Sequence, residues 1–343
     1  MFLEEKIQKK TIICVLMSAI IILGVMCTIR LHYNGNLNRQ QYNPRLIRPI
    51  SVLTWRQLRC NYVASEIMSH IQQPGLGNYL FFYSAIVYVA SITGRRPCIS
   101  RRSRSTPLDA VFDHGLVQMD KKTRVCPQHK FTEKKFGVYD RRIASLVNTT
   151  RDKLLMLHGY FQSWKYVQPV AGRLRDQLRF HREVKEFASK FLYKSVPLGW
   201  KGLKFVRVGV HVRRGDFLLR GPLGFTVADE HYLQRAMSIF IQRFRRVQFV
   251  VASDDIRWCQ NHIKSNSSNV NITFSVGHSA GDDQALLASC DHTVMTTGTF
   301  SWWAAWLANG ITVYYADYPK RGSRLRGGMQ LEDYYHPTWT GLM

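Results

Sequence analysis

Apolar residues are distributed along the chain in three ways, and each predicts a different kind of structure. Residues 11–29 carry no charge, and a helix of this length can span a bilayer. Residues 30–58 lack sustained periodicity and are rich in asparagine and glutamine, which is typical of a flexible linker. From Cys60 onward, short apolar runs alternate with amphipathic segments. The pattern therefore predicts an anchor, a stem and a globular α/β part.

The uncharged stretch predicts a membrane anchor. It is longer than the apolar core of about 7 to 15 residues found in cleaved signal peptides. Lysines precede it and Arg30 follows it. We therefore expect a cytosolic tail at residues 1–10, a transmembrane signal-anchor at residues 11–29 and a stem at residues 30–58. A signal peptide cleaved near Cys27 is the alternative, and the flanking charges do not fix the orientation.

The first half of the globular part is expected to be an α/β domain at residues 59–200. Residues 64–71 have the pattern of a short strand, and a turn rich in breakers follows. The next segment is apolar on nearly all sides, as a buried helix is, and predicts a helix over residues 79–92. Irregular basic loops are expected over residues 97–135, and an amphipathic helix over residues 173–192.

Strands and helices alternate clearly in the second half, residues 201–343. Runs of β-branched residues predict the strands, and amphipathic segments between them predict the helices. The strands are expected at residues 205–212, 247–252, 270–276, 293–296 and 311–316, and the helices at residues 228–245, 255–264, 283–290 and 300–308. This alternation predicts a doubly wound parallel sheet.

Polar or charged residues follow each of these strands. The first strand stops at Arg213 and Arg214, and the fourth is followed by residues 297–301. Because the carboxyl ends of parallel strands share one edge, we expect these segments to form one site. Arginine forks match phosphate oxygens two at a time, and a helix N-terminus offers N–H groups, so the edge suits a diphosphate. A solvated turn and a cell-adhesion tripeptide at residues 214–216 are the alternatives.

Two further segments carry candidate ligand contacts. Asp254 follows the second strand, where a carboxylate suits ribose hydroxyls or a guanine edge, and helix capping is the alternative. In residues 156–166, aromatic side chains are interleaved with Gln162, Ser163 and Lys165. Sugar rings bind to aromatic faces flanked by polar groups, so this segment is a candidate acceptor site. Core aromatics are the alternative.

Composition narrows the partners and the compartment. The apolar fraction of 45% excludes a wholly disordered chain, and the net charge of +25 favours anionic ligands or surfaces. The sequence contains no zinc-finger spacing, no RNP-type pattern and no arginine-rich helix, so no motif indicates nucleic-acid binding. The acceptor sequons at Asn148, Asn266 and Asn271 favour a lumenal location. Five cysteines follow the apolar span, so at least one is unpaired or intermolecular, and the pairing is not deducible from spacing.

Two motifs together closely resemble the α-1,2-fucosyltransferases. They are His211-Val212-Arg213-Arg214-Gly215-Asp216 and Thr297-Gly298-Thr299-Phe300-Ser301-Trp302-Trp303-Ala304-Ala305-Trp306-Leu307. Residues 75–78, 159–166 and 283–290 also fit. Members of this family are type II Golgi membrane enzymes that move L-fucose from GDP-fucose to the 2-hydroxyl of a galactose. The resemblance therefore implies a Golgi membrane location with a lumenal catalytic domain.

The resemblance also implies the architecture and the donor site. It implies a GT-B-like fold with two Rossmann-like domains, inversion at the fucose anomeric carbon and no metal or other cofactor. Arg213 and Arg214 would hold the pyrophosphate, His211 would border the donor pocket, and Thr299, Phe300 and Ser301 would supply further contacts. We also see no Asp-x-Asp motif at a strand end.

The acceptor side is implied by the motifs of the first half. A galactose-terminated glycan would approach Gly77, Asn78, Tyr160 and Gln162. Tyr79 stands where members of the family usually carry glutamine, and this departure concerns acceptor identity more than the donor.

An inverting transfer must stabilise the departing GDP and accept the proton of the attacking hydroxyl. Arg213 is the candidate for the first task, and Asp216 is the candidate base, with orientation of the arginines as its alternative role. A membrane-anchored lectin or adhesion protein without turnover is the alternative function. A fucosyltransferase with another acceptor or linkage is a third possibility.

Overall fold

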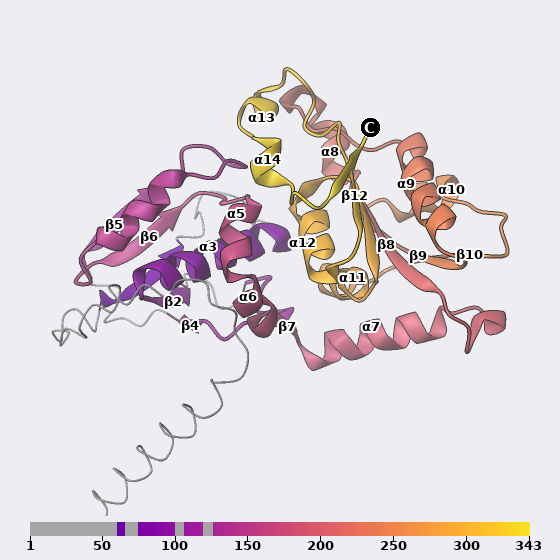
Figure 1. Cartoon of the computed structure of the whole chain (residues 1–343), viewed down its shortest axis with the longest axis horizontal. Helices are drawn as coiled ribbons and strands as arrows, with labels where there is room; N and C mark the ends of the chain where they lie inside the picture. The colour runs from indigo at the N-terminus through magenta and orange to yellow at the C-terminus, as the bar shows by residue number, and fades with distance from the viewer. Residues whose placement is uncertain (1–59, 66–74, 100–105, 119–125) are drawn as a thin grey trace, which may run out of the picture. The chain divides into compact units, whose positions relative to one another are not determined.

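The computed structural model describes residues 60–65, 75–99, 106–118 and 126–343 (Figure 1). These residues belong to one compact unit, Leu53–Met343. The expected tail, signal-anchor and stem lie outside the described residues. Within the described chain the fold is mixed α/β and is built around two parallel sheets.

The N-terminal sheet has five parallel strands in the order β4-β2-β1-β6-β5. The strands are β1 (Tyr62–Ser65), β2 (Arg96–Ile99), β4 (Val117–Gln118), β5 (Gln128–Thr132) and β6 (Leu154–His158). The expectation of irregular loops over residues 97–135 is therefore wrong. The strands there are short, and four of the five residues of β5 are exposed, so no apolar run marks them.

Helix α3 (Leu76–Thr93) is the central helix of this half. It is apolar on all sides because it is buried on nearly all sides, and Gly94 ends it in the left-handed conformation. Its length and composition would allow it to cross a membrane, but most of it is buried inside the fold. The helix begins three residues earlier than predicted, so Gly77 and Asn78 lie in its first turn rather than in a loop.

The helix predicted over residues 173–192 is interrupted. It consists of α6 (Ala171–Gln177) and α7 (Arg182–Lys194), separated by the short strand β7 (Arg179–Phe180). β7 pairs antiparallel with β3 (Phe112–Asp113), and the rings of Phe112 and Phe180 lie 4.6 Å apart. This long-range pairing overrides the local helical pattern. The remaining elements among the described residues of this half are η2 (Arg141–Asn148), α5 (Trp164–Val167), η3 (Gln168–Val170) and η4 (Leu198–Trp200).

The C-terminal sheet has six parallel strands in the order β10-β9-β8-β11-β12-β13. They are β8 (Val206–Val212), β9 (Val247–Ser253), β10 (Val270–Phe274), β11 (His292–Met295), β12 (Thr312–Tyr315) and β13 (Thr340–Leu342). In chain order this is 3-2-1-4-5-6, the doubly wound order of dinucleotide-binding folds. The five predicted strands and their parallel pairing are confirmed. β13 has only three residues, and the sequence pattern did not reveal it.

Helices cover both faces of this sheet (Figure 1). α9 (Glu230–Arg243) and α10 (Ile256–His262) pack on one face, and α11 (Ala280–Ala288) and α12 (Gly298–Ala308) pack on the other. The other helical elements described in this half are α8 (Gly215–Leu219), η5 (Gly221–Leu223), α13 (Arg324–Gly327) and α14 (Leu331–Tyr334). Alternate residues of the strands pack on opposite faces. Val208 and Phe249 pack with α9, whereas Ala252 packs with α11 and α12.

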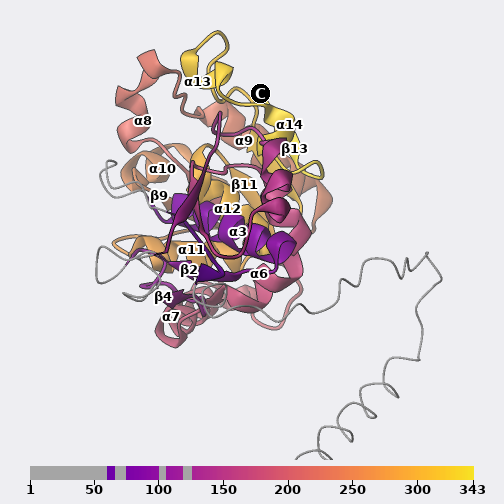
Figure 2. The ribbon, with the colours of Figure 1, turned by 90° about the vertical axis from the view of Figure 1, so that its left-hand side faces the viewer.

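A shared apolar core joins the two halves of the described chain. Helix α3 packs against α12 (Figure 2), and the ring of Phe81 lies 4.7 Å from that of Trp302 and 5.2 Å from that of Trp303. Both tryptophans are fully buried. The tryptophans of the second motif are therefore core residues that connect the two sheets.

Candidate active site

Strands β8 and β11 are neighbours at the centre of the C-terminal sheet, where the strand order reverses. Ligands of doubly wound sheets bind in the crevice at this switch point, beyond the carboxyl ends of the strands. The two motifs follow these two strands. The backbone N–H of Arg213 donates to Oγ1 of Thr296 over 2.9 Å, which ties the two strand ends together. The predicted convergence of the two motifs is thus confirmed.

The guanidinium group of Arg213 is fixed but accessible. It is hydrogen-bonded to the carboxylate of Asp216, its Nη1 lies 3.1 Å from Oδ2 of Asp254, and it lies over the ring of Phe217. The side chain keeps 36% of its surface exposed. Two carboxylates therefore orient a cation that still reaches solvent at the switch point.

Arg214 lies in a different environment. Only 13% of its side chain is exposed, and its guanidinium carbon lies 3.8 Å from the ring centroid of Trp258. Its Nε lies 3.2 Å from Oδ2 of Asp255, and its backbone N–H donates to Asp254. These contacts brace α10 against the end of β8. Asp255 also caps α10 by accepting a hydrogen bond from the backbone N–H of Trp258.

The N-terminus of α12 points its unpaired backbone N–H groups toward the same edge. Thr297 precedes the helix, and its side chain does not cap it. The buried Oγ1 of Thr297 has no hydrogen-bond partner among the described residues. Because the first N–H groups of a helix lack partners inside the helix and lie at the positive end of its dipole, they favour an anion.

His211, near the end of β8, and Ser301, in the second turn of α12, are both buried rather than exposed at the edge. Oγ of Ser301 is hydrogen-bonded to Nδ1 of His211 at 2.5 Å, and the ring of Phe300 lies 4.7 Å from the imidazole. Burial, with a smaller contribution from Arg213, lowers the pKa of His211 to about 3. The imidazole is therefore neutral near pH 7, and its hydrogen bond with Ser301 links β8 to α12.

The motifs predicted for the acceptor side are in direct contact with the motif predicted for the donor side. Oδ1 of Asn78 accepts hydrogen bonds from Nε2 of Gln162 over 2.9 Å and from Oγ1 of Thr299 over 3.1 Å. A side chain on Gly77 would place its Cβ 2.5 Å from the carbonyl carbon of Thr299, so only glycine permits this approach. Residues far apart in the sequence thus converge at the first turns of α3 and α12.

The aromatic segment after β6 divides into core and surface residues. Phe161 and Tyr166 are fully buried, so for them the core alternative is confirmed. Tyr160 is half-buried, and its ring stacks on that of Phe82 at 6.2 Å. Tyr160 therefore remains an aromatic candidate for a sugar contact.

Glu133 is a buried carboxyl group that sequence reasoning did not identify. Its Oε2 accepts hydrogen bonds from the backbone N–H groups of Tyr160 and Phe161, at 2.8 and 3.0 Å. Its Oε1 is buried and has no partner among the described residues. Desolvation raises the pKa of Glu133 to about 8, although the two backbone hydrogen bonds oppose the shift.

These contacts hold residues 159–163, the loop between β6 and α5, in an unusual backbone conformation. Because this loop carries Tyr160 and Gln162, which are predicted to lie on the acceptor side, it is called the acceptor-side loop below. Phe161 has a φ of 51°, which is rare for a residue other than glycine, and Gly159 lies against the Glu133 side chain. The loop then delivers Gln162 to Asn78. The isolated Glu133 between basic residues was the only signal in the sequence, and it does not reveal burial.

Comparison with known proteins places the chain in a family. The model of glycosyl transferase family 11 matches residues 45–343. The chain belongs to glycosyl transferase family 11. It is 33% identical over 273 residues to galactoside 2-alpha-L-fucosyltransferase SEC1 of Bos taurus, covering 78% of this chain and 71% of that protein. It is also 33% identical over 272 residues to galactoside alpha-(1,2)-fucosyltransferase 2 of Pongo pygmaeus, covering 78% and 76%.

Among solved structures, this family 11 chain is similar to Arabidopsis thaliana FUT1 in complex with GDP. The identity is 12%, the TM-score is 0.47, and the match covers 80% of this chain and 76% of that chain.

The remaining sequence expectations concern modification and metals. Asn148 and Asn266 are exposed, whereas Asn271 lies in β10 and its Nδ2 donates to the carbonyl oxygen of Ser195. All three sequons stay predictions. Cys60 and Cys126 form a disulfide that links the segment before β1 to the segment before β5. Within the described ranges, no group of three His, Cys, Asp or Glu side chains is arranged to hold a metal ion.

Proposed function

We propose that this family 11 chain transfers L-fucose from GDP-β-L-fucose to the 2-hydroxyl of a terminal galactose on glycoprotein or glycolipid glycans, with inversion. The observation that carries the proposal is the convergence of Arg213, the N-terminus of α12 and Asn78 at the switch point. The names of the relatives, galactoside α-1,2-fucosyltransferases, support the donor and the linkage.

The donor diphosphate would lie between Arg213 and the first turn of α12. Both offer positive charge and N–H donors, and each hydrogen bond to an ionised group contributes about 1.5–3 kcal/mol. Arg214 would act mainly by bracing α10, because its guanidinium is largely covered. A contact of Asp254 with the ribose or guanine stays a prediction, since its oxygens already accept from Arg213 and Arg214.

Catalysis would rest on stabilising the leaving GDP. Arg213 carries a fixed charge that strengthens its contacts as negative charge develops on the leaving phosphate. Asp216 binds Arg213 through one oxygen, and its other oxygen lies 3.4 Å from Nε of Arg220. Both oxygens of this carboxylate thus lie against guanidinium groups, and these contacts support an orienting role for Asp216.

We further propose a GT-B-like architecture with an acceptor-side domain at residues 59–200 and a donor domain at residues 201–343. The strands of one parallel sheet precede η4 in the sequence and those of the other sheet follow it, which supports this division. The proposed location is the Golgi membrane, in type II orientation with a lumenal catalytic part. The uncharged stretch at residues 11–29 and the sequons support it.

The function can be tested with the full-length chain in detergent micelles. Incubation with GDP-fucose and an array of glycans in excess chelator should fucosylate β-galactosides, and NMR of the product should show an α-1,2 linkage. If GDP-fucose stays intact and no glycan is modified, the transferase assignment is wrong. Glycan binding that GDP does not affect would instead indicate a lectin, and a product on another sugar or hydroxyl would correct the acceptor.

The donor site is tested separately by the Arg213→Ala variant. Loss of its contacts should weaken GDP binding about 10- to 100-fold in calorimetry. Arg245→Ala is the matched control, because Arg245 is exposed and precedes β9 at the opposite edge of the sheet. Equal GDP affinity of the Arg213 variant and the wild type would remove Arg213 from the diphosphate site.

A further inference from the structure

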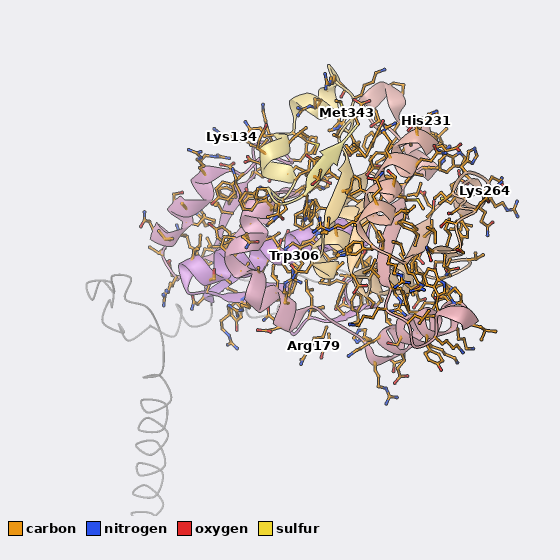
Figure 3. All side chains as sticks on the ribbon, turned by 45° about the vertical axis from the view of Figure 1, so that its right-hand side comes forward. Lys134, Arg179, His231, Lys264, Trp306 and Met343 are labelled. Carbon is orange, nitrogen blue, oxygen red and sulfur yellow. A yellow bond between two sulfur atoms is a disulfide. The ribbon has the colours of Figure 1, made fainter. Side chains whose placement is uncertain are left out.

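A basic cavity lies close to the acceptor-side loop, and none of the contacts described above occupies it. Its volume is about 380 Å³, which is within the range of about 300–1,000 Å³ found for ligand sites. Its lining includes Lys134, Lys135, Tyr139 and Arg141 from the segment after β5, and Met329 and Gln330 from the segment before α14. Figure 3 shows Lys134 beside this C-terminal segment.

The cavity has an unbalanced positive charge. Asp140 also lines it, but this carboxylate accepts hydrogen bonds from Nε and Nη2 of Arg142 and from the backbone N–H of Lys134. The hydrogen bonds with Arg142 hold the pKa of Asp140 below its ordinary value. Its charge is therefore already matched. No described carboxylate forms an ion pair with the remaining cations, Lys134, Lys135 and Arg141.

The walls of the cavity are tied together. The backbone N–H of Tyr139 donates to Oδ2 of Asp333 over 2.8 Å, and the hydroxyl of Tyr139 is hydrogen-bonded to that of Tyr88. The backbone N–H of Gln330 donates to the carbonyl oxygen of Gly137 over 3.0 Å. Because the two segments are already joined, a ligand need not order them when it binds.

Phe136 connects the cavity to the acceptor-side loop. Its ring lies 6.5 Å from that of Tyr160 and also packs against Gly328, whose neighbours Gly327 and Met329 line the cavity. Lys134 directly follows Glu133, which holds the backbone of Tyr160. A glycan that contacts Tyr160 would thus reach the cavity with its next sugar units.

We propose that this cavity binds an anionic group, a sulfate or a carboxylate, on the acceptor glycan. The inference rests on the proposed function for the identity of the ligand as a glycan. The three cations supply the charge, the tyrosine ring supplies an apolar wall for a sugar, and the volume admits a single substituted sugar unit. The enzyme would accordingly prefer charged galactosides to neutral ones.

The test compares three galactoside acceptors that differ only in one unit: neutral, sulfated and sialylated. The variant is Lys134→Gln with Arg141→Gln, and the control is Lys185→Gln with Lys190→Gln, an equal loss of charge on the exposed face of α7. The wild type and the control should show about tenfold higher kcat/KM for at least one charged acceptor than for the neutral one. The cavity variant should lose this preference and keep the neutral rate.

Equal kcat/KM for neutral and charged acceptors in the wild type would overturn the proposal, and so would an equal loss on all acceptors in the cavity variant. Higher kcat/KM for the sulfated acceptor would identify the bound group as a sulfate, and higher kcat/KM for the sialylated acceptor would identify it as a carboxylate. A preference that persists in 0.5 M NaCl would also count against it, because exposed charges are screened at that ionic strength.

A separate binding measurement distinguishes failure of the proposed function. Calorimetry without donor should show the wild type binding the sulfated or sialylated glycan and the cavity variant binding it at least about tenfold more weakly. If no acceptor is fucosylated but this difference remains, the transferase assignment fails and the anion site stands. Binding of anionic lipid vesicles or RNA that survives in the cavity variant, with no glycan binding, would refute the site.

Discussion

Replacement of Glu133 by glutamine tests how the fold holds a carboxyl group beneath the acceptor-side loop. The side chain is buried, one oxygen accepts two backbone hydrogen bonds, and the other has no described partner. Burial raises its pKa from 4.5 to about 8. Glutamine has nearly the shape of the protonated carboxyl and keeps an oxygen for the two N–H groups, but it cannot ionise.

The sign of the pH effect follows from proton binding. Between pH 4.5 and 8 the folded state holds a proton that the unfolded state has released, so the stability from this group falls as pH rises through that window. The contribution is complete below pH 4.5 and lost above pH 8. One pKa unit corresponds to about 1.4 kcal/mol, so from pH 5.5 to 7.5 the wild type should lose about 2.7 kcal/mol relative to Glu133→Gln.

Urea unfolding followed by tryptophan fluorescence at pH 5.5, 6.5 and 7.5 measures this difference. Glu186→Gln on the exposed face of α7 is the control and should track the wild type at every pH. Free energies of unfolding that stay parallel for the wild type and Glu133→Gln across the three pH values would refute the reasoning. That outcome would mean that Glu133 is ionised in the folded protein and that an additional group compensates its charge.

Two further predictions concern packing. Gly77→Ala forces a Cβ against the backbone of Thr299, so it should lower the free energy of unfolding by about 1–3 kcal/mol and reduce the rate of fucose transfer more than tenfold. The control is Gly75→Ala, which has open space around its Cβ and should leave stability and transfer unchanged. A Gly77→Ala variant with wild-type activity would contradict the close approach of α3 to α12. Gln284 is fully buried and neither of its amide atoms has a hydrogen-bond partner among the described residues, so Gln284→Met should raise the melting temperature by about 2 °C. A lower melting temperature would indicate that the amide is hydrogen-bonded, for example to buried water.

The regular elements of the C-terminal half could be predicted because their patterns are local. β8 and β9 are seven-residue strands in which most residues are β-branched or otherwise apolar, and α9 carries apolar residues at helical spacing after the capping residue Asp229. Parallel pairing followed from the alternation of strands and helices. Convergence of the Arg213 and Thr297 motifs then followed, since parallel strands share one carboxyl edge.

Elements that depend on distant partners were not predictable in the same way. β5 has mostly exposed side chains and is a strand only because it pairs with β6. β7 interrupts a helical pattern because its backbone pairs with β3 and Phe180 packs on Phe112. In both cases long-range contacts outweigh local propensity, which spans only about 1 kcal/mol per residue.

The sequence by itself determined the doubly wound sheet, the two motifs at its edge and the family to which the chain belongs. Only the tertiary structure decided what those motifs contact: that Arg213 reaches solvent while Arg214 is covered, that Asn78 joins Gln162 to Thr299, and that Glu133 is buried. The physical reason is that strand and helix periodicity are properties of neighbouring residues. Burial, hydrogen-bond partners and pKa values depend on groups brought together from distant parts of the chain.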